Sequence, residues 1–152
     1  MIYRVVIFLI LNFAALAIGS YFTRAGVQSD WYASIAKAPW TPPGWVFGAA
    51  WTTIMICFSV YMAYLWTTLG NKNLLIGLFL IQWILNVSWN PTFFYYHNVL
   101  GGLFIIVGLT AVVGFILFFY WPQLKLKSAL LVPYFIWLIV ATSLNGYSYF
   151  KN

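Results

Sequence analysis

Charged residues in this chain stand only outside long apolar runs, and this pattern restricts the fold more than any other feature. The first run, residues 5–23 between Arg4 and Arg24, carries no charge and has about the ~20 residues that a helix needs to cross a bilayer. The 152 residues are 64% hydrophobic and 5% charged, and Asp30 is the single acidic residue. Because a soluble domain has roughly a quarter of its residues charged, we predict an integral membrane protein.

Turn-forming residues divide the rest of the chain into four further apolar runs of helical length. Prolines at 42 and 43 suit the start of a helix, and the glycine at 70 suits the end of one. The alternation expected of a barrel strand is absent. We predict an all-α integral membrane protein, a five-helix bundle in a single domain. Its spans are residues 5–23, 44–69, 74–96, 99–120 and 128–150.

Residues 25–43 form the one long segment that does not span, and we expect this segment to cover one end of the bundle as a lid. Its three prolines and its charged residues exclude it from the bilayer core. Within it, residues 30–37 are predicted to form a short interfacial helix with Asp30 as the N-cap.

The basic residues differ slightly in number between the two sides of the membrane. Five spans put the termini on opposite sides, and positively charged loops stay in the cytoplasm. We therefore expect a multi-pass protein of a bacterial membrane with a cytoplasmic N-terminus and an outward-facing lid. Because the basic residues form no stripe, nucleic-acid binding is not expected. Arg4, Lys72, Lys125 and Lys127 lie on the N-terminal side, against Arg24, Lys37 and Lys151 on the lid side.

Two of the predicted spans carry polar and aromatic residues along one helical face, because spacings of three and four align side chains. Asn86 lies near the middle of its span. A buried amide there either forms an interhelical hydrogen bond or marks a functional site, and the sequence leaves both open. The two stripes are Gln82, Asn86, Trp89 and Phe93 in the third span, and Pro133, Trp137, Ala141 and Asn145 in the fifth.

Trp51, Asn86 and Trp137 can therefore converge from three helices at a similar depth. At ~1.5 Å per residue, Trp51 lies ~10 Å beyond Gly44 and below the lid. Two indoles and one amide suit a large planar ligand, because aromatic faces stack on it and a few polar groups orient it. The small Ala141 permits the close approach of a flat molecule or of another backbone.

These motifs, in this order, resemble the TspO/MBR family of tryptophan-rich sensory and translocator proteins over nearly the whole chain. The chain departs from the family at Lys37-Ala38-Pro39-Trp40, where members commonly read Lys-Pro-x-Trp. The resemblance rests on Trp31-Tyr32, Lys37, Trp40-Thr41-Pro42-Pro43, Gly48, Trp51, Leu85-Asn86, Trp89, Pro91, Phe93-Phe94, Pro133-Tyr134, Trp137, Ala141-Thr142 and Leu144-Asn145.

The resemblance implies a usually homodimeric bundle with a ligand pocket beneath the loop that follows the first helix. It implies porphyrins, protoporphyrin IX or haem, as ligands and no required cofactor, together with related small planar molecules and lipid or sterol. The segment 144–151 also matches a loose sterol pattern, which an aromatic belt ending in lysine produces as well. By motif position the ligand-binding residues are Trp51, Asn86 and Trp137, surrounded by Trp31, Tyr32, Trp40, Trp89, Phe93, Ala141 and Asn145.

Three functions remain open on the sequence. The leading one is a membrane receptor or sensor that binds tetrapyrroles and could transport or hand over its ligand. The alternative is an enzyme that degrades porphyrin in light and oxygen, with Trp51 and Trp137 as its catalytic residues. A passive helical scaffold is the third. With no glutamate, one histidine and one cysteine, the chain lacks the side chains for ordinary acid–base or metal catalysis, so no metal site is expected.

Overall fold

The computed structural model describes residues 1–152 as a succession of helices without a strand, which confirms the all-α class. A π-helical turn, Pro91–Tyr95, extends α4, and a 3₁₀ segment, Lys125–Leu130, joins α6 to α7. The α-helices are α1 (Ile2–Val27), α2 (Asp30–Ser34), α3 (Gly44–Thr68), α4 (Asn73–Asn90), α5 (Val99–Phe119), α6 (Trp121–Leu124) and α7 (Val132–Lys151).

Four of these helical stretches are long and apolar enough to cross a membrane: α1, α3, α4 with its π-helical turn, and α5. The fifth span is a bent pair, because Trp121–Leu130 and Val132–Lys151 meet at 72°. The straight part therefore starts at Val132 and not at Ser128 as predicted. Pro133 at the start of α7 has no N–H group, so it suits a first helical turn and not the interior of a longer helix.

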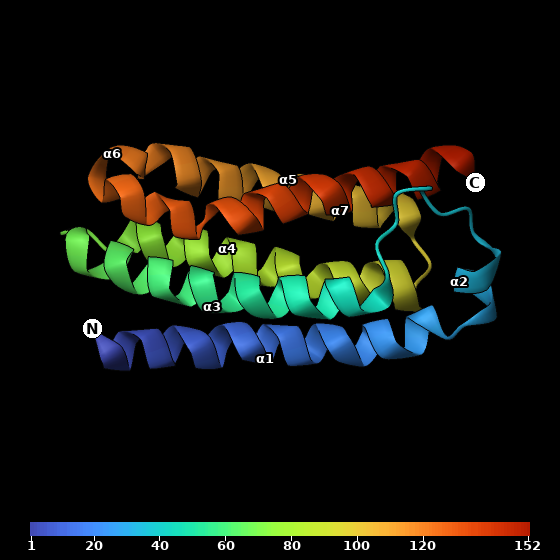
Figure 1. Ribbon diagram of the computed structural model, residues 1–152, viewed down its shortest axis with the longest axis horizontal. Helices are drawn as coiled ribbons and strands as arrows, with labels where there is room; N and C mark the ends of the chain where they lie inside the picture. Colours follow the sequence, from blue (N-terminus) through green and yellow to red (C-terminus); the bar gives the residue numbers. More distant parts are fainter.

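The long helices form a ring around a buried core (Figure 1). In this ring α1 packs against α3 and α4, α4 packs against α5, and α5 packs against α7. Met55, Phe58, Tyr61 and Tyr134 are fully buried inside it. The ring closes between α3 and α7, which approach each other along a much shorter length than the other neighbours do. We call this closure the α3–α7 seam.

The termini lie at opposite ends of the bundle (Figure 1). The N-terminus and α6 occupy one end, whereas α2 and the C-terminus occupy the other. Helix α1 continues to Val27, so the lid begins at Gln28 and not at Ala25 as predicted. The expected separation of the lid from the N-terminus is therefore present in the fold.

Gly26 allows α1 to lie against the π-helical turn, and this contact gives a test of the packing. A Cβ on Gly26 would lie 2.2 Å from Cδ1 of Phe94 and 2.5 Å from its Cβ, so it would meet the base of the side chain. We expect Gly26→Ala to lower the free energy of unfolding in detergent by about 1–3 kcal/mol, the usual range for overpacking.

Gly77→Ala is the control for this substitution, and both are measured by thermal or denaturant unfolding. A Cβ on Gly77 would meet nothing within 4 Å, and alanine is the better helix former by about 1 kcal/mol. Gly77→Ala should therefore leave the stability unchanged or raise it. An equal loss in both variants would contradict the close contact at Gly26.

Candidate functional site

Two pairs of aromatic rings cross the α3–α7 seam. Phe47 and Trp137 meet edge to face with ring centres 5.4 Å apart, and Trp51 and Tyr134 do so at 5.9 Å. Phe47 and Trp51 are about one turn apart on α3, as are Tyr134 and Trp137 on α7, so the rings stand one pair above the other. We call these four residues the aromatic ladder. Phe47 was not predicted, although its spacing of four from Trp51 placed it on the same face.

Two hydrogen bonds hold α4 beside α7 and define the depth of Asn86. The Tyr134 hydroxyl donates to Oε1 of Gln82 at 3.0 Å, and Nε1 of Trp89 donates to Oδ1 of Asn145 at 2.9 Å. Asn86 lies between Gln82 and Trp89 on the same face of α4. Its amide is therefore level with the part of α7 between the two bonds, which carries Trp137 and Ala141, the first two predicted ligand-binding positions on that helix.

The side-chain polar atoms of Trp51, Asn86 and Trp137 make no hydrogen bond within the chain, and the same holds for Trp31 and Tyr32 of the lid, whereas Trp40, Trp89 and Asn145 are bonded. Nε1 of Trp137 is buried without a partner. Asn86 is half-buried, and its side chain makes no hydrogen bond; only its backbone oxygen accepts one from a side chain, the amide of Asn90. Ala141 lies about one turn beyond Trp137 on the same face of α7. The bundle thus holds unpaired donors on α3 and α7 and an unpaired amide on α4, as a ligand with polar edges requires.

Trp89, Asn145 and Trp40 are engaged with other parts of the chain. Asn145 accepts from Trp89 and donates to the backbone oxygen of Val99 at 2.9 Å. Nε1 of Trp40 donates to Oγ of Ser143 at 3.0 Å. Trp89 and Asn145 are bonded to each other and Trp40 to Ser143, so the geometry gives these residues a structural role in the walls and the lid.

The lid, residues 28–43, begins with the short helix α2. Oγ of Ser29 accepts a hydrogen bond from the backbone N–H of Tyr32 at 3.1 Å, so the prediction of Asp30 as the N-cap is wrong. Ser29 has the extended backbone of a cap, φ −78° and ψ 149°, whereas Asp30 already lies in the first turn. The helix ends at Ser34, before the predicted Lys37, because Ile35 is extended.

Aromatic contacts hold α2 against the π-helical turn and the residues that follow it. The Trp31 ring stacks on His97 with ring centres 4.1 Å apart and meets Phe93 at 5.5 Å. Tyr32 packs on Phe94 at 5.6 Å, and burial raises the pKa of its hydroxyl. Trp31 and Tyr32 therefore form the base of the lid and pack on the π-helical turn that contains Phe93. These three predicted site residues contact one another or the turn, and not the aromatic ladder.

The far end of the lid is fastened to α7. The side chain of Asn152 accepts from the N–H of Ala36 at 2.9 Å and donates to the oxygen of the same residue at 3.4 Å. The Trp40 ring also meets Tyr147 edge to face at 5.4 Å. The sequence analysis missed Ser143, Tyr147 and Asn152, although the first two stand four apart on one helical face.

Two lipid-facing grooves flank α7. The groove along the α3–α7 seam has a volume of about 550 Å³, and its walls include Ala49 and Thr53 of α3 and Pro133, Ile136 and Trp137 of α7. No charged residue lines it. Trp137 thus belongs both to this groove and to the aromatic ladder, so the groove reaches the ladder at this residue.

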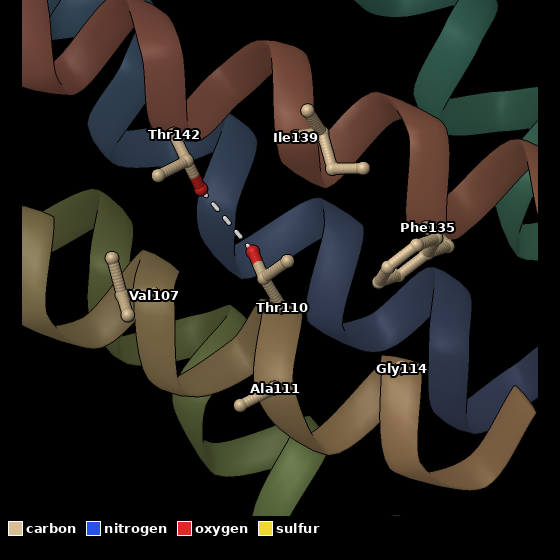
Figure 2. Close-up of a pocket in the computed structure, with 7 residues that line it drawn as sticks. All are labelled: Val107, Thr110, Ala111, Gly114, Phe135, Ile139 and Thr142. Atoms are coloured by element: carbon tan, nitrogen blue, oxygen red, sulfur yellow. Dashed lines mark hydrogen bonds between the residues drawn. The ribbon is translucent and has the colours of Figure 1, made fainter. Parts of the chain in front are cut away.

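The groove between α5 and α7 has a different floor (Figure 2). Its volume is about 470 Å³. The hydroxyls of Thr110 and Thr142 are hydrogen-bonded at 3.2 Å, and the Phe135 ring lies against Gly114, where a Cβ would be 2.8 Å from Cε2. The two helices are therefore closely joined beneath this groove, which is a surface hollow.

The fold and the arrangement of its tryptophans define a class, an all-helical integral membrane protein with a lid over one end. The TspO/MBR family model matches residues 7–150. The chain is 36% identical to the tryptophan-rich protein TspO of Archaeoglobus fulgidus over 91% of this chain and 92% of that protein. It is 35% identical to protein CrtK of Rhodobacter capsulatus (76% and 74%) and 33% to the translocator protein of Ovis aries (84% and 78%). The chain belongs to the TspO/MBR family.

The attachment of the lid to α7 gives a test. Asn152→Ala removes both side-chain hydrogen bonds to Ala36, each worth about 0.5–1.5 kcal/mol net. We expect amide hydrogen exchange in residues 35–41 to rise by roughly 3-fold or more, because local opening there becomes easier. Lys151→Ala, at an exposed neighbouring position, is the control and should leave exchange unchanged. Unchanged protection in Asn152→Ala would show that the lid does not depend on this attachment.

Proposed function

We propose that this protein is a membrane receptor or sensor that binds a tetrapyrrole, such as protoporphyrin IX or haem, between α3, α4 and α7 and hands it over to a further acceptor. The observation that carries the proposal is the set of unpaired polar atoms at Trp51, Asn86 and Trp137 beside the aromatic ladder. Relatives named as sensory and translocator proteins support the same class.

Binding of a planar ligand follows from the chemistry of these residues. Edge-to-face rings can separate and stack on a flat molecule instead, because both arrangements have similar energies. The buried Trp137 N–H can donate to a carboxylate or carbonyl oxygen on the rim of the ligand, and the Asn86 amide can both donate and accept. The ligand thereby satisfies a group that the empty protein leaves unpaired.

The remaining expectations on membrane context belong to this proposal. We infer a cytoplasmic N-terminus and an outward-facing lid, because the end that carries the N-terminus and α6 holds one more basic residue than the lid end. The bacterial membrane, the homodimer and the binding of lipid or sterol stay predictions.

Asn86 and Asn145 provide a matched test of the binding site. Asn86→Ala should weaken binding of protoporphyrin IX by about 1–3 kcal/mol, roughly 5- to 150-fold, and leave stability unchanged, because its side chain has no partner in the protein. Asn145→Ala should lower stability, because it unpairs Trp89 and the oxygen of Val99. Titration by tryptophan quenching and unfolding in detergent measure the two effects. Equal affinity in wild type and Asn86→Ala would show that the Asn86 amide does not bind the ligand.

A second candidate function is light-dependent degradation of the bound porphyrin by oxygen. The observation that favours it is that two oxidisable indoles, Trp51 and Trp137, stand in the aromatic ladder at the proposed site. Trp51→Phe with Trp137→Phe keeps rings that can stack but removes the indoles. We expect the double variant to keep part of its porphyrin binding and to lose the bleaching of the porphyrin band under light in air. Bleaching at the wild-type rate would exclude catalysis by these tryptophans.

A further inference from the structure

We propose that the ligand passes between the bilayer and the binding site through the α3–α7 seam, and not under the lid. This proposal rests on the tetrapyrrole function above and adds the route by which the ligand arrives. The occupant of the seam groove is accordingly a planar aromatic molecule that is dissolved in the membrane and carries hydrogen-bond acceptors on its rim.

The seam is the weakest joint of the ring. Every other neighbouring pair of long helices approaches closely at many positions, whereas α3 and α7 do so at only a few. Near the N-terminal end of the bundle, the 3₁₀ segment Lys125–Leu130 packs against α3 and closes the gap. Toward the lid the two helices are joined through ring contacts, with Phe47 against Trp137 and Trp51 against Tyr134.

The groove over the seam has the chemistry of a passage for an apolar ring system. Its α3 wall presents Ala49 and Thr53, which are small and exposed on the lipid-facing side. On α7, Pro133 and Ile136 are exposed, and Trp137 lies behind them with a buried, unpartnered N–H. A ligand that enters from lipid therefore meets apolar surface first, then rings, and finally a hydrogen-bond donor.

The lid and the α5–α7 groove are closed by directed contacts. The lid is attached to α7 by Asn152 and Trp40, and its base is stacked on His97 through Trp31. The α5–α7 groove has a floor of bonded threonines and no unpaired donor behind it (Figure 2). Toward the lid, opening the seam separates two ring pairs, which are worth about 0.5–1.5 kcal/mol each beyond the area they bury.

A passage differs from a binding site in its kinetics, and this difference gives the test. Ala49→Trp fills the groove from α3, and Ile136→Trp fills it from α7; both positions are exposed to lipid, so the larger ring should not disturb the core. Protoporphyrin IX is presented in phosphatidylcholine vesicles that contain the full-length protein. Stopped-flow tryptophan quenching measures association, and transfer to excess empty vesicles measures dissociation.

We expect both filled variants to slow association and dissociation by the same factor, about tenfold, and to keep the dissociation constant within about twofold, because an obstructed passage affects both directions equally. Ala111→Trp is the matched control, since it makes the same change in the lipid-facing α5–α7 groove and should leave both rates unchanged. Asn152→Ala, which loosens the lid, should leave both rates unchanged as well.

Three results would overturn the passage. Rates equal to those of Ala111→Trp would show that the seam is not used. A weaker affinity with faster dissociation would make the groove part of the binding site. Severalfold faster exchange in Asn152→Ala would place the route under the lid. Each of these still leaves saturable binding by the wild-type protein, whereas a wild-type protein that binds no protoporphyrin IX would overturn the proposed function itself.

Discussion

The requirement that buried polar groups find partners inside the protein determines how this bundle is assembled. In hydrocarbon an unpaired donor or acceptor costs several kcal/mol, and water is not there to satisfy it. Gln82 and Tyr134 satisfy each other across the bundle, as do Trp89 and Asn145. These two bonds determine how far α4 is displaced along α7. The depth of every other residue on the two helices follows from them.

The unpaired side chains of Trp137 and Asn86 are exceptions to this pairing. Most buried side-chain polar atoms of the bundle are bonded, and the N–H of Trp137 is one of the few that are not. On α4, Asn86 lies on the same helical face as Gln82 and Trp89, which are bonded, but its side chain has no partner of its own. A donor on α7 and an amide on α4 that are free in an otherwise apolar interior are the polar groups on which the proposed ligand recognition depends.

Much of the architecture could be predicted because it depends on local periodicity. Long apolar runs without charge predicted α1, α3, α4 and α5. Spacings of three and four predicted that Gln82, Asn86 and Trp89 lie on one face of α4. Trp51 and Trp137 both lie at the seam, whereas their convergence with Asn86 stays a prediction. Which amides bond to each other was not predictable, because Asn86 and Asn145 look alike in sequence and differ only in the displacement of one helix along another.

The missed local features have similar causes. Ser29 and Asp30 are both good N-caps, and one residue of difference lies within the uncertainty of any pattern. The attachment of Asn152 to Ala36 joins residues far apart in the chain, so no spacing rule reveals it. The bend before α7 was not predictable, because residues 125–130 form a 3₁₀ segment whose composition gives no signal of a break before the helix.

The aromatic ladder explains how one seam can be both closed and easy to open. Edge-to-face ring contacts are weak, non-covalent and similar in energy to the stacked contacts that a planar ligand offers. Separation of Phe47 from Trp137 and of Trp51 from Tyr134 therefore exchanges one set of ring contacts for another. The hydrogen bonds of α4 to α7 stay intact in this exchange, so α3 can move relative to α7 while the depth of Asn86 is kept. Selectivity then comes from the ligand's acceptors, because only a molecule that pairs with the free donors gains more than the rings lose.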